Sequence, residues 1–428
     1  MKESIKKRIE AVRRGEIPEG YVFENHQLYP ADWQYEKIGG FLTPYDEYSN
    51  DIEKYPLATS SRQGLMLQSK YYSDQRYEET SGGFHIVPDG YVTYRHMSDD
   101  DIFRFNINEM GMPVLVSPEY PVFTTTDGLN QDMLVAYLNN MKEFRAYCSA
   151  QKKGSTRTRM YFSRLCEFAI PIPPVSEQRR IAEILATCDR VIELKQQLLE
   201  EKRRQKRWLM QKLLDCNSGI RLHGYGGEWT PWQLRDIGAF AKGSGISNDD
   251  CISGEYPCIK YGDIYISYDE YFIDAISHTE RDVYDKSPTV STGTLLFTGS
   301  GEDPNEIGKC TVYLGHHPIA VGGDIIIMNP NRKKVYPLFL TYVLNTYSAV
   351  KQKSYLGQGY SIVHIYSEDI KRIKVCIPPT IDEQKHIAEI IRTANVEVRS
   401  LEEEVTAWQQ KKKALMQLLL TGLVRMNA

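Results

Sequence analysis

The sequence predicts an α/β protein built from two similar globular segments, each followed by one long helix. Three features predict this fold class: an internal repeat, a diproline before each expected helix, and an apolar row with helical spacing. Eleven residues from Glu177 to Thr187 return at Glu383 to Thr393 with seven identities. A solenoid repeat has a period of only roughly 20 to 50 residues, so this much longer period indicates a duplicated module.

The repeat extends backwards through both globular segments. The distance between matched residues drifts only from 199 to 206 positions over the whole unit, which argues against a chance match. The matched residues include Gly154 with Gly359, Tyr137 with Tyr342, Tyr55-Pro56 with Tyr256-Pro257, and Trp33-Gln34 with Trp232-Gln233.

Composition and charge narrow the class of protein. The chain has 428 residues, 41% hydrophobic and 25% charged, as is usual for soluble globular proteins. It has no apolar run near the roughly 20 residues of a membrane span, and its first ten residues are too charged for a signal peptide. The eight cysteines form no Cys-x-x-Cys pair. We therefore expect a reduced, cytoplasmic protein without a structural metal site.

The net charge of −4 does not exclude nucleic acid as a partner, because the basic residues are clustered. Residues 142–164 contain seven basic side chains and one acidic side chain, Glu143. A local basic cluster can bind phosphate even when the whole chain is acidic.

Each expected helix begins beside a diproline, at Pro173-Pro174 and at Pro378-Pro379. Proline ends a preceding strand and suits the first turn of a helix. Ser176 and Asp382 follow, and we expect them to be the N-caps. The helices should then run over residues 177–214 and 383–420, each about 57 Å long at about 1.5 Å per residue.

Apolar residues recur along both helices at alternating spacings of three and four, which is typical of a coiled coil. In the second helix only Lys412 interrupts the row; in the first, Lys195, Lys202 and Lys206 do. Two helices of matched length favour an antiparallel pair related by a pseudo-twofold axis. The alternative is that each helix packs only on its own globular segment. An antiparallel pair would hold the two segments apart, at a spacing suited to sites about one turn of duplex DNA from each other.

Two variable segments, each closed by a Pro-Pro-x-x-Glu-Gln-x-x-Ile-Ala-Glu-Ile helix, resemble the DNA-specificity subunits of type I restriction-modification enzymes. The Leu-Met-Gln-x-Leu-Leu helix ends and the Pro-x-x-Trp-Gln lead-in fit the same pattern, and the resemblance covers nearly the whole chain. It implies an N-terminal helical arm (1–31), target-recognition domain 1 (32–175), a central conserved helix (176–216), target-recognition domain 2 (217–378) and a distal conserved helix (379–428).

The resemblance also implies a function. The chain would be non-catalytic and would recognise a bipartite double-stranded DNA site, one half-site for each recognition domain. Its partners would be two methyltransferase subunits that methylate adenine, and motor-nuclease subunits that restrict DNA. No cofactor is expected in this chain; S-adenosylmethionine would bind the methyltransferase subunits, and ATP and Mg would bind the restriction subunits.

Two functions from other classes remain as alternatives. Phe297-Thr298-Gly299-Ser300-Gly301 matches a short glycine motif of S-adenosylmethionine-dependent methyltransferases. Such a motif is weak by itself, and the catalytic tetrapeptide of amino-methyltransferases is absent from the sequence. The sequence also lacks a phosphate-binding loop for ATP. A purely structural coiled-coil scaffold is the second alternative.

The repeat identifies one matched loop per domain as a DNA-contact candidate. Residues 154–159 align with residues 359–364, just before the last strand of each segment. Arginine can read guanine edges or neutralise phosphates, and Ser or Thr can contact either. The alternative for the first loop is a basic loop that is only hydrated. In the second domain, residues 362–365 could pack in the core instead of contacting DNA. The candidates are Lys152, Lys153, Arg157 and Arg159 in the first domain, and Gln358, Tyr360, Ser361 and His364 in the second.

A second pair of matched positions follows a Tyr-Pro turn and a short apolar strand in each domain. We expect both to be strand-end loops that face a DNA groove. The candidates here are Arg62, Gln63, Lys260 and Tyr261.

Overall fold

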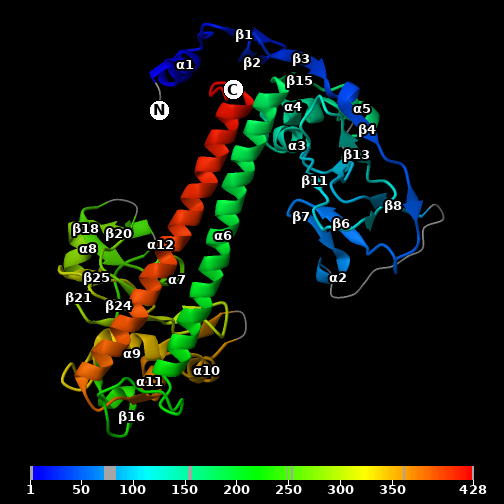
Figure 1. The fold of residues 1–428 in the computed structure, drawn as a ribbon. Coiled ribbons are helices and arrows are strands. Elements are labelled where there is room, and N and C mark those ends of the chain that lie inside the picture. Colours follow the sequence, from blue (N-terminus) through cyan, green and yellow to red (C-terminus); the bar gives the residue numbers. More distant parts are fainter. Residues whose placement is uncertain are drawn as a thin grey trace. The chain divides into compact units, whose positions relative to one another are not determined.

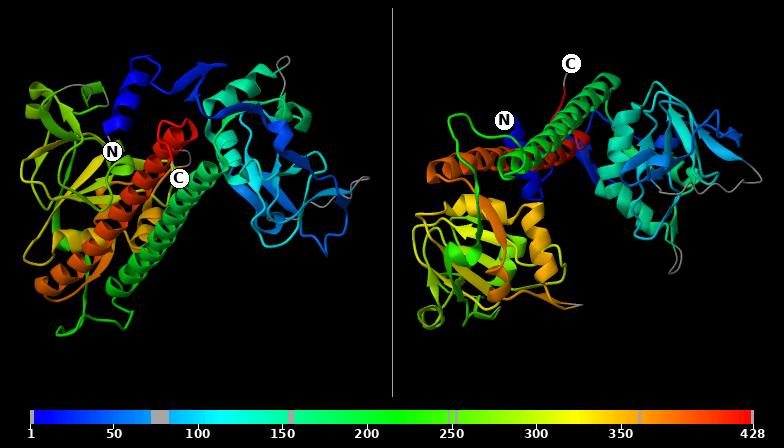
Figure 2. Two further views of the ribbon diagram at one scale, coloured as in Figure 1. Left: turned by 45° about the horizontal axis from the view of Figure 1, so that its top comes forward. Right: turned by 90° about the horizontal axis from the view of Figure 1, so that it is seen from below.

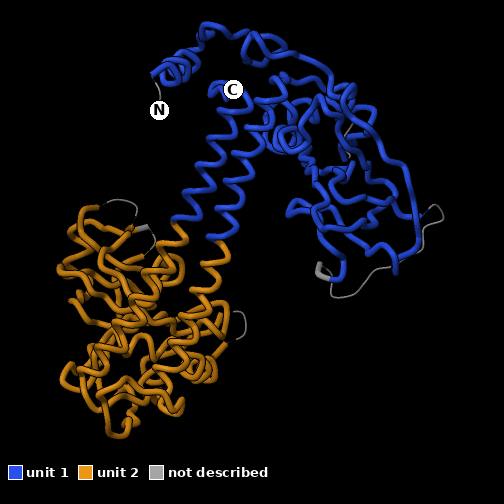
Figure 3. The backbone as a smooth tube through the Cα atoms, in the orientation of Figure 1, with its two compact units in different colours: residues 1–195, 404–428 blue, residues 196–403 orange. Residues whose placement is uncertain are grey.

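The computed structural model of the chain describes residues 3–71, 83–152, 157–247, 249–251, 254–359 and 362–426. It divides into two compact units, residues 1–195 with 404–428 and residues 196–403 (Figure 3). Each unit contains one globular segment and a stretch of both long helices, as Figures 1 and 2 show.

The two long helices are α6 (Val175–Leu213) and α12 (Ile381–Leu420). Both begin earlier than predicted, and the predicted N-caps are wrong. The first helical hydrogen bonds run from the amides of Gln178 and Gln384 to the carbonyls of Pro174 and Thr380. The Thr380 hydroxyl also accepts from the Glu383 amide at 3.3 Å, so Thr380 is the capping residue. Ser176 and Asp382 therefore lie inside the first turns, where an acidic side chain suits the helix dipole.

Within each unit the two helices pair in an antiparallel manner. In unit 1 the start of α6 shares a core cluster with the end of α12, through Ile181, Leu185 and Leu419. In unit 2 the end of α6 shares a cluster with the start of α12, through Leu213 and Ile387. The prediction of a paired helical scaffold is confirmed, and the alternative of helices without contact to each other is excluded.

The lysines in the apolar row of α6 do not interrupt this pairing. Lys195, Lys202 and Lys206 are half-buried. Their ammonium groups bind Glu404, Glu397 at 2.8 Å and Glu270 at 3.2 Å. A lysine can cover apolar surface with its aliphatic stem while its charge remains paired or hydrated. All ten positions of the predicted row are therefore buried or half-buried: Ile181, Leu185, Cys188, Ile192, Lys195, Leu199, Lys202, Lys206, Leu209 and Leu213.

The repeated Glu-Gln pair fixes each globular segment to its helix. Gln178 accepts from the Asn130 amide at 2.6 Å and donates to the Pro173 carbonyl at 2.8 Å. Gln384 makes the equivalent bonds, accepting from the Tyr336 amide at 2.7 Å and donating to the Pro378 carbonyl at 3.0 Å. The amide bound by each glutamine belongs to the residue that precedes a helix, α3 or α9. These bonds explain why a glutamine recurs at the start of both long helices.

The neighbouring glutamates hold the segments that follow the long helices. Glu177 binds Arg425 at 3.0 Å and accepts from the Trp33 indole at 3.2 Å, both within unit 1. Glu383 binds Arg221 at 2.7 Å within unit 2. Both carboxylates are buried, and a buried charge requires such a partner.

The globular part of unit 1 is formed by short strands and helices. Its main sheets have the strand orders β11-β9-β13-β4 and β12-β8-β5, and all their pairs are antiparallel. The elements are α1 (Glu3–Arg13), β1 (Tyr21–Glu24), β2 (Gln27–Pro30), β3 (Gln34–Lys37), the 3₁₀ turn Ile38–Phe41, β4 (Leu42–Pro44), β5 (Tyr48–Ser49), β6 (Ala58–Ser61), β7 (Gly64–Leu67), α2 (Gln68–Tyr71), β8 (Phe84–Val87), β9 (Val92–Tyr94), β10 (Met97–Ser98), β11 (Phe105–Ile107), β12 (Val114–Val116), β13 (Val122–Thr125), α3 (Gln131–Asn140), α4 (Lys142–Ala150), β14 (Thr158–Arg159), α5 (Phe162–Cys166) and β15 (Ala169–Ile172).

The globular part of unit 2 has a five-stranded sheet of order β17-β26-β22-β24-β19 and a four-stranded sheet of order β20-β18-β25-β21. Its elements are β16 (Thr230–Gln233), the 3₁₀ turns Leu234–Asp236 and Asp249–Cys251, β17 (Gly238–Lys242), β18 (Tyr256–Ile259), α7 (Tyr261–Ile266), β19 (Tyr271–Phe272), β20 (Ser277–Thr279), α8 (Arg281–Lys286), β21 (Thr289–Val290), β22 (Leu295–Thr298), β23 (Ser300–Gly301), β24 (Cys310–Tyr313), β25 (Ile319–Val321), β26 (Ile325–Pro330), α9 (Pro337–Leu344), α10 (Tyr347–Leu356), β27 (Val363–His364), α11 (Ser367–Ile370) and β28 (Lys374–Ile377).

The two globular parts repeat the same peripheral pairs. β3 pairs with β15 in unit 1, as β16 pairs with β28 in unit 2. β10 pairs with β14, as β23 pairs with β27. The last two pairs carry the matched loops that the sequence identifies as DNA-contact candidates. Within the described residues, none of the helices has the length and apolar character needed to cross a membrane.

Candidate nucleic-acid interface

The hairpin β6–β7 presents the first two candidates of unit 1. Ser61 pairs with Gly64, so Arg62 and Gln63 form the two-residue turn between the strands. Gly64 has a φ of 126°, a conformation open mainly to glycine, which explains the tight turn. Both candidate side chains are exposed. Arg62 donates from Nη2 to Oδ1 of Asp100 at 2.5 Å.

The pair β10–β14 presents the next candidates, with Met97 opposite Arg159 and Ser98 opposite Thr158. Three consecutive aspartates follow β10 directly. Arg157 donates from Nε to Oδ1 of Asp99 at 2.7 Å. The ammonium of Lys152 lies 3.9 Å from Oδ1 of Asp101. Lys153 lies outside the described residues.

Asp101 connects the loop that follows β10 to two neighbouring elements. Its carboxylate accepts from the hydroxyl of Thr158, which is buried, and from Ser149 Oγ at 3.2 Å. The loop is thereby joined to β14 and to α4. The aspartates therefore bring together three of the predicted residues, which come from two parts of the sequence: Arg62, and Lys152 with Arg157.

Of these residues, Arg62, Gln63 and Asp99 border a cleft of about 410 Å³. Two further arginines, Arg95 and Arg104, line the same cleft. The sequence reasoning missed Arg104 and all three aspartates as members of the site. The run Asp99-Asp100-Asp101 was a visible signal, but the long-range pairing that makes it part of the site has no sequence signature.

Arg159 faces a different pocket, of about 260 Å³, together with His96, Glu119 and Tyr161. Its Nη1 donates to the Tyr161 hydroxyl at 3.2 Å, and this bond raises the pKa of Arg159. The His96 ring stacks on the Tyr161 ring at a centroid distance of 5.6 Å. Burial lowers the pKa of His96, so this imidazole is neutral at pH 7. Arg159 is therefore adjacent to the cleft cluster without being part of it.

In unit 2 the structure corrects the expectation of a strand-end loop at Lys260 and Tyr261. Lys260 is the residue before α7, and Tyr261 is the first residue of that helix. The Lys260 amide donates to Oδ2 of Asp263 at 3.1 Å. This carboxylate, three residues after Lys260 in the sequence, caps the start of a helix where a loop was expected. The Tyr261 side chain is exposed, while that of Lys260 is half-buried.

The other unit 2 candidates lie around β27. Gln358 and His364 exchange two backbone hydrogen bonds, at 2.9 and 2.8 Å, and both side chains are exposed. Val363 and Ile365 point inwards and are buried, so the run 362–365 alternates as a strand does. Tyr360 and Ser361 lie outside the described residues. The structure does not bring Lys260 or Tyr261 into a common cluster of contacts with Gln358 or His364.

Lys353, a basic residue near the candidates of unit 2, is almost fully buried. Only 1% of it is exposed, and its ammonium donates to the Gly308 carbonyl at 2.8 Å. Burial lowers its pKa to about 8. Lys353 lies on the face of α10 that packs inwards together with Ala349, so it does not contribute to a DNA-contact surface.

The glycine motif of the methyltransferase alternative is part of the strand framework. Phe297 and Thr298 belong to β22, and Ser300 and Gly301 form β23. A Cβ on Gly301 would lie 2.6 Å from the Tyr265 hydroxyl, so close packing accounts for this glycine. The described residues also contain no group of three or more His, Cys, Asp or Glu side chains that could hold a metal ion.

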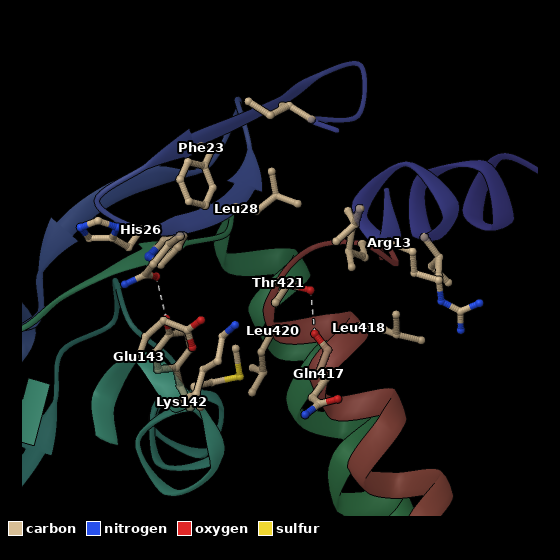
Figure 4. A pocket seen from close by; sticks show the side chains of 18 of the residues that line it. Arg13, Phe23, His26, Leu28, Lys142, Glu143, Gln417, Leu418, Leu420 and Thr421 are labelled. Atoms are coloured by element: carbon tan, nitrogen blue, oxygen red, sulfur yellow. Dashed lines mark hydrogen bonds between the residues drawn. The ribbon is translucent and has the colours of Figure 1, made fainter. Parts of the chain in front are cut away.

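A larger cavity of unit 1, about 820 Å³, lies between the N-terminal segment, the start of α4 and the end of α12 (Figure 4). Phe23, Leu28 and Leu418 give it an apolar lining, with Lys142 and Glu143 at one side. The Arg8 guanidinium and the Tyr21 hydroxyl hold the N-terminal segment to the carbonyls of Leu423 and Gly422, at 3.1 and 2.6 Å. This lining does not suit a phosphate backbone, so the basic cleft is the better DNA-contact candidate.

Comparisons with known proteins agree with this arrangement. A putative type I restriction enzyme specificity subunit, MjaX of Methanocaldococcus jannaschii, is 25% identical over 306 residues, covering 69% of this chain and 68% of that protein. The MjaVIII specificity subunit of the same organism is 23% identical over 428 residues, covering 93% and 94%.

Solved structures show the same fold at low identity. The S subunit of the type I restriction-modification system of M. genitalium matches with a TM-score of 0.58 and 16% identity, over 93% of this chain and 97% of that chain. A chain from a study of assembly and conformational transition in the type I system matches with a TM-score of 0.50 and 14% identity, over 92% and 99%.

The family model described as the type I restriction modification DNA specificity domain matches residues 32–202 and again residues 226–404. These two copies cover most of the chain and follow its internal repeat. The chain therefore belongs to the family of type I restriction-modification specificity subunits.

Proposed function

We propose that this chain is a non-catalytic DNA-recognition subunit in which each globular segment reads one half of a bipartite double-stranded site. The observation that carries the proposal is the duplication. The family model matches twice, and each matched copy has its own Gln anchor between globular segment and helix. A segment with its own anchor can act as a separate reading module.

The chemistry of unit 1 supports DNA as the ligand. Arginines at a polar cleft can contact phosphates or guanine edges, and the hairpin turn presents Arg62 and Gln63 to solvent. Unit 2 offers the exposed side chains of Tyr261, Gln358 and His364. Arg159, with its neighbouring aromatic rings, adds a second possible contact in unit 1.

The partners and cofactors follow from the family. We propose that the chain assembles with two methyltransferase subunits and with restriction subunits. S-adenosylmethionine then belongs to the methyltransferase subunits, which methylate adenine, and ATP and Mg belong to the restriction subunits. The strand role of the Phe297–Gly301 segment supports this division, because close packing already explains its glycines.

The test uses the chain reconstituted with its methyltransferase subunits. Selection from random duplexes should yield two short sequences separated by an unread gap. The purified chain alone should transfer no labelled methyl group from S-adenosylmethionine to DNA. Methyl transfer by the chain alone would favour the methyltransferase alternative, and the absence of any sequence preference in the assembly would favour a structural scaffold.

A further inference from the structure

The aspartates at 99–101 are an unexpected element of a surface proposed to bind DNA. Each of them holds one basic side chain of the predicted contact set: Asp99 holds Arg157, Asp100 holds Arg62, and Asp101 lies near Lys152. Carboxylates at this place repel phosphates and reduce the positive potential that draws DNA to the surface. Non-specific affinity for DNA alone would not favour three consecutive aspartates at this surface.

Folding stability does not explain the pairs either. The side chains of Arg157 and Asp99 are 55% and 69% exposed, and those of Arg62 and Asp100 are 61% and 44% exposed. Exposed ion pairs contribute only about 0 to 1 kcal/mol to stability, because both charges remain hydrated. The clustering of two such pairs at one cleft therefore has another cause.

The carboxylates are themselves held in place. Asp100 accepts from Ser98 Oγ at 2.9 Å as well as from Arg62. Burial works to raise the pKa of Asp100, but these two hydrogen bonds, a third from the Ile102 amide and the charge of Arg62 together outweigh it, and the net pKa lies below the ordinary value. The bonds from Thr158 and Ser149 to Asp101 fix the end of the run. Asp100 is therefore ionised in the neutral pH range, and hydrogen bonds position both Asp100 and Asp101.

The geometry of the Arg157 pair leaves the reading end of the side chain available. Arg157 binds Asp99 through Nε, so its two terminal nitrogens are not used in this bond. Those two nitrogens form the fork that can bind O6 and N7 of guanine together. A side chain fixed at Nε also loses less conformational freedom when it meets a base.

We propose that Asp99 and Asp100 are positioning residues for sequence discrimination in the first recognition domain. Asp99 restrains Arg157 for contact with base edges that present two acceptors, as guanine does, and Asp100 holds Arg62 in place through Nη2. Both aspartates oppose contact of these arginines with phosphates. This inference rests on the proposed function, because it assigns a mechanism of specificity to that DNA-contact surface.

The experiment compares Asp99→Asn, Asp100→Asn and the double variant in the complex with methyltransferase subunits. Binding is measured for the selected site, for duplexes changed in one half-site, and for unrelated duplexes over a series of salt concentrations. Released arginines should contact phosphates, so binding to unrelated DNA should tighten several-fold. The salt slope should increase by about one for each released arginine. Discrimination at the half-site of the first domain should fall about tenfold in the double variant, and discrimination at the other half-site should not change.

Glu167→Gln is the matched control. Glu167 also forms an exposed ion pair in unit 1, with Lys37 at 2.5 Å, but it does not line the cleft. This variant removes the same charge as each aspartate variant, so it should leave discrimination unchanged. Thermal unfolding of all variants should match the parent, because exposed pairs are altered and Asp101 is retained.

The outcomes separate the two proposals. A parent complex without any sequence preference contradicts the proposed function, and the inference fails with it. A sequence-specific parent whose aspartate variants keep full discrimination contradicts the inference alone. The same holds if Glu167→Gln reproduces their effect, or if the variants lose specific and non-specific binding in equal measure.

Discussion

Gln178 and Gln384 illustrate how one residue type can determine the placement of a whole segment. Each is fully buried, and each joins the start of its own helix to a backbone amide and to backbone carbonyls of the globular segment. A glutamine side chain can accept and donate at once, which a glutamate cannot do when ionised. Because only backbone atoms are bound, the anchor tolerates a variable globular sequence.

Replacing Gln178 with leucine should lower the free energy of unfolding of unit 1 by about 2 to 4 kcal/mol. The Asn130 amide and the carbonyls of Gly128 and Pro173 would lose their partner, and each buried unpaired group costs about 1 to 3 kcal/mol. Urea unfolding measures the change. Gln410→Leu, at an exposed position of α12, is the control and should change the value by less than about 0.5 kcal/mol. Equal effects of both variants would show that the anchor is not important for stability.

Lys353 should make unit 2 more stable as the pH rises above about 8. Its pKa is about 8 in the folded protein and 10.5 as the ordinary value, so the unfolded state binds more protons between these two pH values. Stability therefore increases with pH in this window and does not depend on this group well below pH 8. Between pH 7 and 9.5 the gain should be about 2 kcal/mol relative to Lys353→Met. Parallel stability profiles for parent and variant would contradict the burial of a charged amine.

The helices show why a hydrophobic pattern alone gives an incomplete description of an element. The row of α6 contains three lysines, which the pattern scores as interruptions. In the structure each lysine meets an acidic residue distant in sequence, and the row continues. The helix starts were also misplaced, because residue type alone does not show which of several neighbouring residues is the cap. Ser176 and Asp382 are good capping residues, but the first helical hydrogen bonds go to the carbonyls of Pro174 and Thr380.

Within α6, Lys202 should contribute much less to stability than Leu199. The Lys202 pair with Glu397 is partly exposed, and Lys202→Ala should cost less than about 1 kcal/mol. Leu199 is 7% exposed, and Leu199→Ala should cost about 2 to 5 kcal/mol, since it removes buried apolar contacts. Thermal or urea unfolding of both variants gives the comparison. A Lys202→Ala variant as unstable as Leu199→Ala would mean that the ion pair, and not apolar burial, holds the helices together.

In the molecule as a whole, the duplicated design was predictable and the local chemistry of the sites was not. A repeat is visible in sequence because matched residues such as Gln178 and Gln384 have the same contacts in both copies. The recognition surfaces differ between copies: the aligned positions form a hairpin turn at Arg62 and the first turn of a helix at Tyr261. Sequence also identified Arg62, Lys152 and Arg157 individually. The aspartates that bind them are distant from Arg62 and Arg157 in sequence, and the burial of Lys353 depends on tertiary packing.

The central claim is that the two globular segments read DNA independently. Exchanging residues 33–172 for the counterpart of a relative tests it most directly. The paired strands β3 and β15 lie at the two ends of this region, and Gln178 of the recipient binds only its backbone, so the foreign segment should dock on α6. The recognised sequence of the hybrid complex is then measured by methylome sequencing or by selection from random duplexes. The account predicts a change in one half-site, with the other half-site and the gap retained. A hybrid that is folded and assembled but changes both half-sites would contradict it.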